Sequence, residues 1–142
     1  MRNISSYRIT IVIITVIALL AIIGCSNGRS SNAPKSDSPG AQTVQQVSME
    51  EAVKAWRNRE AVFVDVRTVE EYKQGHVPGA VLIPLAEIEN RRGEIPIDKK
   101  VYIICRSGNR SSQANLILQK RGIGNTYSVN GGMLDWQGDV EK

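Results

Sequence analysis

The chain has 142 residues, of which 42% are hydrophobic and 23% charged, and a formal net charge of +4. This composition excludes a fully disordered chain, a collagen and a polytopic membrane protein. The two cysteines exclude a disulfide-stapled miniprotein, and the single histidine argues against a His-rich metal site. From Val47 to Lys142 there are 14 Lys and Arg against 13 Asp and Glu, a net of +1. The excess positive charge therefore lies near the N-terminus, and we expect no nucleic-acid partner.

The first 25 residues have the layout of an export signal. Arg2 and Arg8 are the only charged side chains among them, and the fifteen residues of Ile9–Ile23 are apolar except for two threonines. A bilayer-spanning helix needs about 20 residues, so this run fits the core of a signal peptide better. It ends in Gly24-Cys25, which resembles the bacterial lipoprotein signal. The resemblance implies cleavage after residue 24 and lipidation of Cys25; an uncleaved anchor helix with an incidental cysteine is the alternative.

Residues 26–46 are dominated by Ser, Asn, Gly, Pro and Gln. Such a segment cannot bury enough surface to offset its ordering entropy, so we expect a flexible tether without a site. Together with Cys25 it forms segment 25–46, between the signal peptide at 1–24 and one compact domain at 47–142. Either interpretation of the N-terminus holds this domain on the outer side of the cytoplasmic membrane. We therefore expect a bacterial cell-envelope location, lipid-anchored and facing the periplasm or the exterior.

Apolar runs and helix-start signals alternate along the domain. Short runs rich in β-branched residues predict buried strands at 61–66, 80–83, 101–104 and 126–129. Capping boxes at Ser48 and Thr68 each open a helix, and Gly75 ends the second. Helical spacing of apolar residues predicts further helices at 85–92 and from Ala114 to about Gly122. This alternation indicates an α/β domain with a mostly parallel sheet, whose ligands bind beyond the carboxyl ends of the strands.

One such strand end carries the pattern of a reactive cysteine. Cys105 follows the strand at 101–104, and the next residues are polar or glycine until a helix begins. Gly108 permits a positive φ, so that backbone N–H groups can converge on the sulfur. These donors, the N-terminus of the following helix, and the charges of Arg106 and Arg110 all favour a thiolate. The pattern predicts a nucleophile suited to anionic substrates, with a small buried cysteine as the alternative.

Five blocks make the domain similar to the single-domain rhodaneses, the thiosulfate:cyanide sulfurtransferase family. They are Asp65-Val66-Arg67, Glu71-Tyr72, GHVPGA at 75–80, CRSGNRS at 105–111, and NGGM through Trp136 at 130–136. The resemblance implies a rhodanese-like α/β fold with a five-stranded, mostly parallel sheet and helices on both faces. We expect a monomer without metal or cofactor.

The resemblance also implies a reaction and its residues. The Cys105 thiolate would take the outer sulfur of thiosulfate or a similar small anionic donor, and the resulting persulfide would pass it to a thiol or cyanide acceptor. The loop expected to bind the persulfide and to attract the donor comprises Arg106, Ser107, Gly108, Asn109 and Arg110. Membrane contact would come only through the N-terminal lipid.

Several residues near these blocks have supporting rather than chemical roles in our interpretation. Asp65 and Arg67 are expected to pair or to brace the neighbouring loop. His76 is expected to be a turn residue bonded to backbone, because a thiolate that is already ionised needs no base. Gly131-Gly132 should permit a close backbone turn near the active face. Trp56 and Trp136 are expected to be packing residues.

Two other functions compete with sulfur transfer. The first is a non-catalytic rhodanese-fold module that binds a persulfide or senses redox state. The second is a cysteine phosphatase or arsenate reductase, which also cradles its cysteine in a loop with an arginine. The phosphatase signature places five residues between the two, whereas four separate Cys105 from Arg110. A shorter loop suits one sulfur atom better than a tetrahedral oxyanion, so the spacing favours sulfur transfer.

Overall fold

A computed structural model of the chain describes residues 42–142. The predicted signal peptide, Cys25 and the tether up to residue 41 lie outside the described residues. The strands are β1 (Gln46–Val47), β2 (Ala61–Asp65), β3 (Val81–Leu82), β4 (Lys100–Ile104) and β5 (Thr126–Val129). The helices are α2 (Met49–Arg57), α3 (Val69–Gln74) and α4 (Asn109–Lys120), with 3₁₀ turns η1 (Arg92–Glu94) and η2 (Gly132–Leu134). None of these described helices is long and apolar enough to cross a bilayer.

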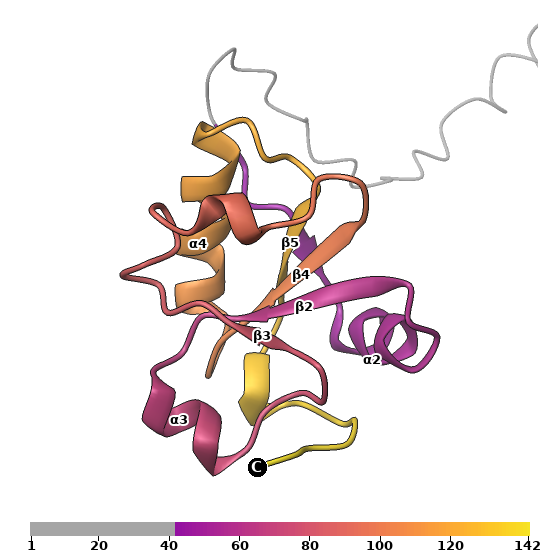
Figure 1. Cartoon of the computed structure of the whole chain (residues 1–142). Helices are drawn as coiled ribbons and strands as arrows, with labels where there is room; N and C mark the ends of the chain where they lie inside the picture. Colours follow the sequence, from indigo (N-terminus) through magenta and orange to yellow (C-terminus); the bar gives the residue numbers. More distant parts are fainter. Residues whose placement is uncertain (1–41) are drawn as a thin grey trace, which may run out of the picture. The chain divides into compact units, whose positions relative to one another are not determined.

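The strands form one sheet in the order β1-β5-β4-β2-β3, and every pairing is parallel. The two strands β2 and β4 pair along their whole length, from Ala61 opposite Lys100 to Asp65 opposite Ile104. Their β-branched side chains suit a strand that is buried on both faces. Figure 1 shows α2 and α4 on opposite sides of this sheet. The predicted α/β fold, with a five-stranded parallel sheet flanked by helices on both faces, is confirmed.

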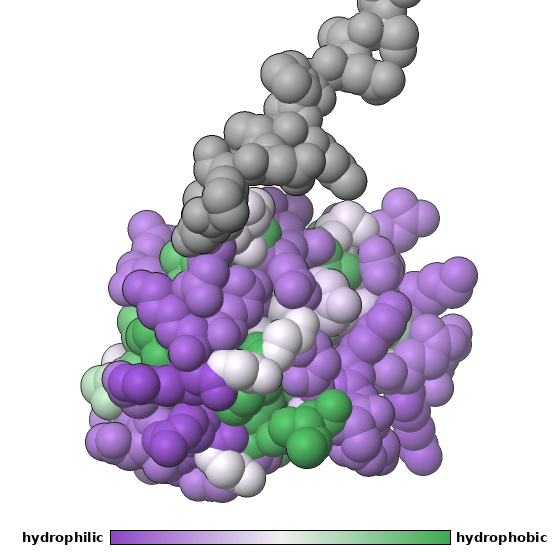
Figure 2. All heavy atoms as spheres, turned by 90° about the horizontal axis from the view of Figure 1, so that it is seen from above, coloured by the Kyte–Doolittle hydropathy of each residue, from purple (hydrophilic) through white to green (hydrophobic). Residues whose placement is uncertain are grey.

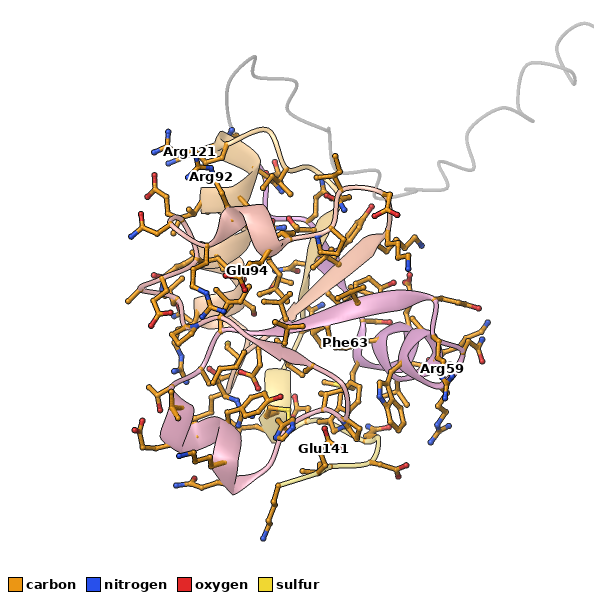
Figure 3. All side chains as sticks on the ribbon, in the orientation of Figure 1. Arg59, Phe63, Arg92, Glu94, Arg121 and Glu141 are labelled. Atoms are coloured by element: carbon orange, nitrogen blue, oxygen red, sulfur yellow. The ribbon has the colours of Figure 1, made fainter. Side chains whose placement is uncertain are left out.

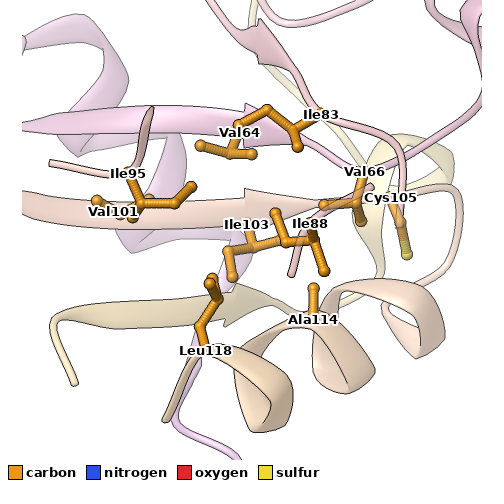
Figure 4. Close-up of a cluster of buried hydrophobic side chains, with 10 residues drawn as sticks. All are labelled: Val64, Val66, Ile83, Ile88, Ile95, Val101, Ile103, Cys105, Ala114 and Leu118. Atoms are coloured by element: carbon orange, nitrogen blue, oxygen red, sulfur yellow. The ribbon is translucent and has the colours of Figure 1, made fainter. Parts of the chain in front are cut away.

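The core determines on which face of the sheet the cysteine lies. Ile103 of β4 packs in the cluster that α4 covers, whereas Tyr102 and Ile104 pack in the cluster that α2 covers. Successive strand residues point to opposite faces, so Cys105 returns to the α4 side. Figure 4 shows its side chain at one end of the first cluster.

Both predicted capping boxes lie at the start of a helix. The Ser48 hydroxyl accepts a hydrogen bond from the Glu51 N–H at 3.2 Å and caps α2. At α3 the box is reciprocal, because the Thr68 hydroxyl accepts from the Glu71 N–H and the Glu71 carboxylate accepts from the Thr68 N–H. Helix α3 then ends at Gly75, as the sequence predicts. The second box fixes the position of the Glu71 carboxylate as well as the start of the helix.

The prediction of a helix at 85–92 is wrong. This stretch is a series of turns that ends in η1. Bonds of the i→i+3 kind are formed, such as that from the Glu87 N–H to the Pro84 carbonyl, and one i→i+4 bond joins Arg91 to Glu87. Because i→i+3 bonds outnumber i→i+4 bonds here, the segment winds as successive turns rather than as an α-helix. The apolar spacing nevertheless marked a core position, since Ile88 is fully buried.

Strand β1 was not among the expected strands, and it begins at Gln46, one residue before the expected domain boundary. Gln46 and Val47 pair with Ser128 and Val129 of β5. The preceding Gln45 also joins the fold, because its carbonyl accepts from the Ser128 N–H at 2.8 Å. Two residues are too few to show the period-two pattern of a strand, so β1 depends on tertiary pairing alone.

The surface of the described domain mixes polar and apolar side chains, as is usual for a folded domain. The face drawn in Figure 2 is mainly hydrophilic, with a compact group of hydrophobic side chains. The most exposed large hydrophobic residues are Ile97 at 79%, Leu134 at 65% and Val140 at 52%. Leu134 and Val140 line one cavity together, whereas Ile97 lies in the bend before β4.

Helix α2 ends in a turn that usually contains glycine. The N–H groups of Arg59 and Glu60 donate to the carbonyls of Trp56 and Ala55, which is the Schellman arrangement. Arg59, labelled beside α2 in Figure 3, has a φ of +58° and is the one non-glycine residue in 42–142 with a positive φ. An L side chain is strained in this left-handed conformation.

We therefore expect Arg59→Gly to raise the free energy of unfolding by roughly 1 kcal/mol or less. Relief of the strain should exceed the extra freedom that glycine gives to the unfolded chain. Urea denaturation measures the change. The matched control, Arg57→Gly inside α2, should instead lower stability by about 1 kcal/mol. Equal losses in the two variants would contradict the prediction.

Candidate active site

Cys105 lies directly after β4, at the carboxyl end of the central strand, and is only 1% exposed. Three residues later, Gly108 forms the N-cap of α4 with a φ of +96°. The positive φ expected for Gly108 is therefore present. The turn joins strand to helix and directs the Gly108 N–H back toward the Cys105 sulfur, 3.1 Å away.

Two opposing effects set the acidity of this thiol. Burial among the aliphatic side chains of the core raises the pKa of Cys105. Hydrogen bonds from the Ser111 hydroxyl and from the N–H groups of Ser111, Ser107 and Gly108 lower it. The hydrogen bonds outweigh burial, so that the pKa of Cys105 lies below its ordinary value. The site therefore favours a thiolate, the nucleophilic form of cysteine.

Three serine hydroxyls surround the Gly108 carbonyl behind the thiol. The hydroxyls of Ser111 and Ser112 donate to it at 2.9 and 2.8 Å, and the Ser128 hydroxyl lies 2.7 Å from that of Ser111. The Ser111 oxygen also accepts from the Cys105 thiol, with sulfur and oxygen 3.6 Å apart. A hydroxyl has one proton, so Ser111 can donate to the thiolate only by leaving the Gly108 carbonyl, and Ser128 can then donate to Ser111. Ser128 is thus a positioning residue, which the sequence analysis missed because it lies on another strand.

The segment after β5 clamps the backbone of the cysteine loop. The N–H groups of Met133 and Leu134 donate to the carbonyls of Cys105 and Arg106 at 2.8 and 3.0 Å. Gly132 has a φ of +59°, and a Cβ placed there would lie 2.4 Å from the Cys105 carbonyl oxygen. Only glycine allows this approach. The close backbone turn that the sequence suggested at Gly131-Gly132 therefore holds the loop itself.

Asp65 and Arg67 form a buried ion pair next to the loop that follows α3. The Asp65 carboxylate is fully buried and accepts from the backbone N–H, Nε and Nη2 of Arg67, with the shortest distance at 2.6 Å. Arg67 Nη2 also donates to the Gly75 carbonyl at 2.7 Å. The pair thus does both things expected of it, because it is internally bonded and braces the turn at Gly75.

The two arginines of the cysteine loop differ in their surroundings. Arg110, at the start of α4, forms a two-pronged ion pair with Glu71, with Nη1–Oε2 at 2.6 Å and Nη2–Oε1 at 2.7 Å. The Arg110 guanidinium lowers the pKa of Glu71 to about 2, so the carboxylate is ionised at neutral pH. Arg106 is exposed, and within residues 42–142 no carboxylate lies within ion-pair distance of it. From the sequence we expected both arginines to be free to attract an anion, whereas in the structure the Glu71 carboxylate neutralises Arg110.

A cavity of about 450 Å³ opens beside the loop. Its lining combines charged and apolar side chains: Arg67, Glu71, Gln74, Gly75, Arg106, Met133, Leu134 and Val140. The other two loop residues, Ser107 and Asn109, are exposed and border a separate hollow on the far side of the loop. The Asn109 side chain accepts a hydrogen bond from Gln113 at 2.6 Å. Within residues 42–142 no group of three or more His, Cys, Asp or Glu side chains could hold a metal ion.

His76 lies in the turn after α3, and its two ring nitrogens contact the Tyr72 carbonyl at 3.0 Å and the Glu141 carboxylate at 3.1 Å. Its ring also stacks on that of Tyr72, with centroids 3.6 Å apart. Glu141, labelled near the C-terminus in Figure 3, ties the last residues of the chain to this turn. Trp56 and Trp136 pack edge to face at 5.9 Å, which is a packing role.

A family model described as a rhodanese-like domain matches residues 48–139, and these residues include the whole cysteine loop. The chain belongs to the rhodanese-like domain family. A rhodanese-like domain protein of Staphylococcus aureus has a crystal structure that is similar at a TM-score of 0.64 and 30% identity. The similarity covers 69% of this chain and 97% of that one.

Two further relatives carry names that bear on activity. The "Putative sulfur carrier protein YrkF" of Bacillus subtilis is 38% identical over 105 residues, which is 73% of this chain and 57% of that protein. A sulfurtransferase of Allochromatium vinosum is 42% identical over 77 residues, or 54% of this chain and 72% of that one. This rhodanese-like chain thus spans little more than half of the Bacillus protein. The family and these names support a sulfurtransferase-type function.

The Ser128–Ser111 contact predicts a change in thiol acidity. Ser128→Ala should raise the pH midpoint of thiolate formation by roughly half a unit. The Ser111 hydroxyl would then have no hydrogen bond from Ser128 when it rotates to donate to the thiolate. The rate of alkylation of Cys105 by iodoacetamide, measured against pH, reports this midpoint.

Ser112→Ala is the matched control, because its hydroxyl donates to the same Gly108 carbonyl and lies 3.2 Å from that of Ser128, whereas the hydrogen bonds of the Cys105 sulfur go to Gly108 and Ser111. It should leave the midpoint within about 0.2 unit of wild type. An unchanged midpoint in Ser128→Ala, in a protein that unfolds at the wild-type urea concentration, would contradict the positioning role.

Proposed function

We propose that this protein transfers a sulfane sulfur through a persulfide on Cys105. The observation that carries the proposal is the environment of the sulfur, which is buried at a strand end and accepts a hydrogen bond from the Gly108 N–H at 3.1 Å, with the N–H groups of Ser111 and Ser107 also lowering its pKa. Such donors stabilise negative charge on one atom, whether that atom is the thiolate sulfur or the terminal sulfur of a persulfide. The rhodanese-like family and the sulfurtransferase-named relative support the same reaction type.

The reaction takes place in two balanced steps. The Cys105 thiolate attacks the outer sulfur of a donor such as thiosulfate, the sulfur–sulfur bond of the donor breaks, and sulfite leaves with the bonding electron pair. A cyanide ion or a thiolate acceptor then attacks the terminal sulfur of the persulfide, and the Cys105 thiolate is released. Because the enzyme carries the sulfur between the two half-reactions, we expect ping-pong kinetics.

The expected result with thiosulfate alone is one added sulfur atom on Cys105, seen by mass spectrometry of the full chain. Addition of cyanide should remove that sulfur and release thiocyanate. Cys105→Ser should abolish both signals because its hydroxyl cannot form a persulfide, whereas the control Cys25→Ser should keep both. Stable loading without release to cyanide or to any thiol would point instead to a persulfide-binding or redox-sensing module.

We also propose that the domain is anchored to the bacterial cell envelope through a lipid on Cys25 and faces the periplasm or the exterior. The support is the order of positive residues, apolar core and Gly24-Cys25 in the sequence. Two or three acyl chains hold a protein on a membrane far more firmly than one. The tether would then keep the domain clear of the headgroups.

In cells that express the full chain, labelled fatty acid should enter the protein, which should partition into the detergent phase. Cys25→Ala should lose the label, because the acylated thiol is gone. Cys105→Ala is the matched control and should keep the label. Equal labelling of wild type and Cys25→Ala would overturn the lipid assignment.

A further inference from the structure

The charge at the mouth of the site is smaller than its three arginines suggest. Arg67 is paired with the buried Asp65, and Arg110 is paired through both terminal nitrogens with Glu71. Arg106 is the remaining guanidinium, and among the described residues no carboxylate pairs with it. These five groups sum to +1, so a dianion such as thiosulfate meets a single uncompensated cation.

The Glu71 carboxylate is held in place before any ligand arrives. One of its oxygens accepts from the Thr68 N–H in the capping box of α3 as well as from Arg110. The other accepts from the second terminal nitrogen of Arg110. An anion that needed the fork of Arg110 would have to displace a carboxylate that is bonded at both oxygens. Glu71 therefore neutralises the charge of Arg110 and also occupies both of its terminal nitrogens.

Part of the wall of this cavity is apolar. Met133 is half-buried, and Leu134 and Val140 remain 65% and 52% exposed while they line the same cavity as Arg106. A volume of about 450 Å³ lies within the range of pockets for small organic molecules, about 300–1,000 Å³. Such a wall offers nothing to an inorganic anion but suits the carbon skeleton of an organic donor.

We propose that Glu71 is a specificity-determining residue that selects an organic persulfide of low charge over thiosulfate as the sulfur donor. The organic part rests on Met133, Leu134 and Val140, and the single negative charge of the persulfide faces Arg106. This inference depends on the persulfide chemistry proposed for Cys105. In the balanced step, the Cys105 thiolate attacks the terminal sulfur of R–S–S⁻, the sulfur–sulfur bond of the donor breaks, the terminal sulfur stays on Cys105 as its persulfide anion, and R–S⁻ leaves with the electron pair.

The test compares two donors on the same full-length protein. They are thiosulfate and the persulfide of N-acetylcysteine methyl ester, whose only ionisable group is the persulfide. The rate of sulfur addition to Cys105 by rapid-quench mass spectrometry gives the kcat/KM of loading for each donor. Intrinsic differences in donor reactivity cancel when the ratio of the two values is compared between variants.

Glu71→Gln should raise kcat/KM for thiosulfate at least about fivefold, because Arg110 becomes an uncompensated cation while glutamine can still cap α3. The gain should shrink as ionic strength rises. The value for the organic persulfide should stay within about twofold. Leu134→Asn should do the reverse and lower the organic persulfide value several-fold more than the thiosulfate value.

Glu94→Gln is the matched control, because it breaks a similar two-pronged pair with Arg91 in the η1 region without lining the cavity. It should leave both donors unchanged. A donor ratio that is the same in wild type and Glu71→Gln would overturn the specificity role while sulfur still reaches Cys105. Failure of both donors to load Cys105 would instead overturn the proposed function itself, and this inference with it.

Discussion

The left-handed turn at Gly108 is the constraint on which the site depends. Its φ of +96° directs an N–H at the Cys105 sulfur and turns the carbonyl toward the hydroxyls of Ser111 and Ser112. A side chain at this φ would be strained by about 1–2 kcal/mol. Without these donors, burial alone would raise the pKa of Cys105 and leave an inert core thiol. The backbone conformation of Gly108 thus decides whether Cys105 favours a thiolate or remains a packing residue.

The parts around this turn each serve the fold and the site together. Glu71 caps α3 and also neutralises Arg110, so a helix-start signal becomes part of the charge of the cavity. The η2 turn ends the β5 connection and also binds the Cys105 carbonyl through the Met133 N–H. Gly132 makes this possible because a Cβ there would collide with the same carbonyl. Backbone groups of η2 therefore hold the carbonyls of the cysteine loop, while the Gly108 N–H contacts the sulfur.

Local signals predicted four of the five strands, the starts of α2 and α3, and the cysteine at a strand end, because each depends on a few neighbouring residues. The prediction of a helix around Ile88 was wrong, since apolar spacing indicates burial even where the backbone forms i→i+3 turns instead of an α-helix. The Glu71–Arg110 pair joins residues 39 apart, and the Ser111–Ser128 contact joins residues 17 apart. No local pattern connects such residues, and only the packing of α3 and β5 around the loop brings them together. Net charge at a site is thus a tertiary property, even where every arginine is visible in the sequence.

The position of Arg110 also bears on the competing phosphatase chemistry. A cysteine phosphatase needs a guanidinium that faces the oxyanion beside its thiol. Here four residues separate Cys105 from Arg110, which places Arg110 in the first turn of α4 with both terminal nitrogens bonded to Glu71. Arg67 is likewise bonded to Asp65. The donors that lower the pKa of Cys105 are the Ser111 hydroxyl and the N–H groups of Ser111, Ser107 and Gly108, and no guanidinium is among them. The geometry therefore favours transfer of a single sulfur over hydrolysis of a phosphate ester.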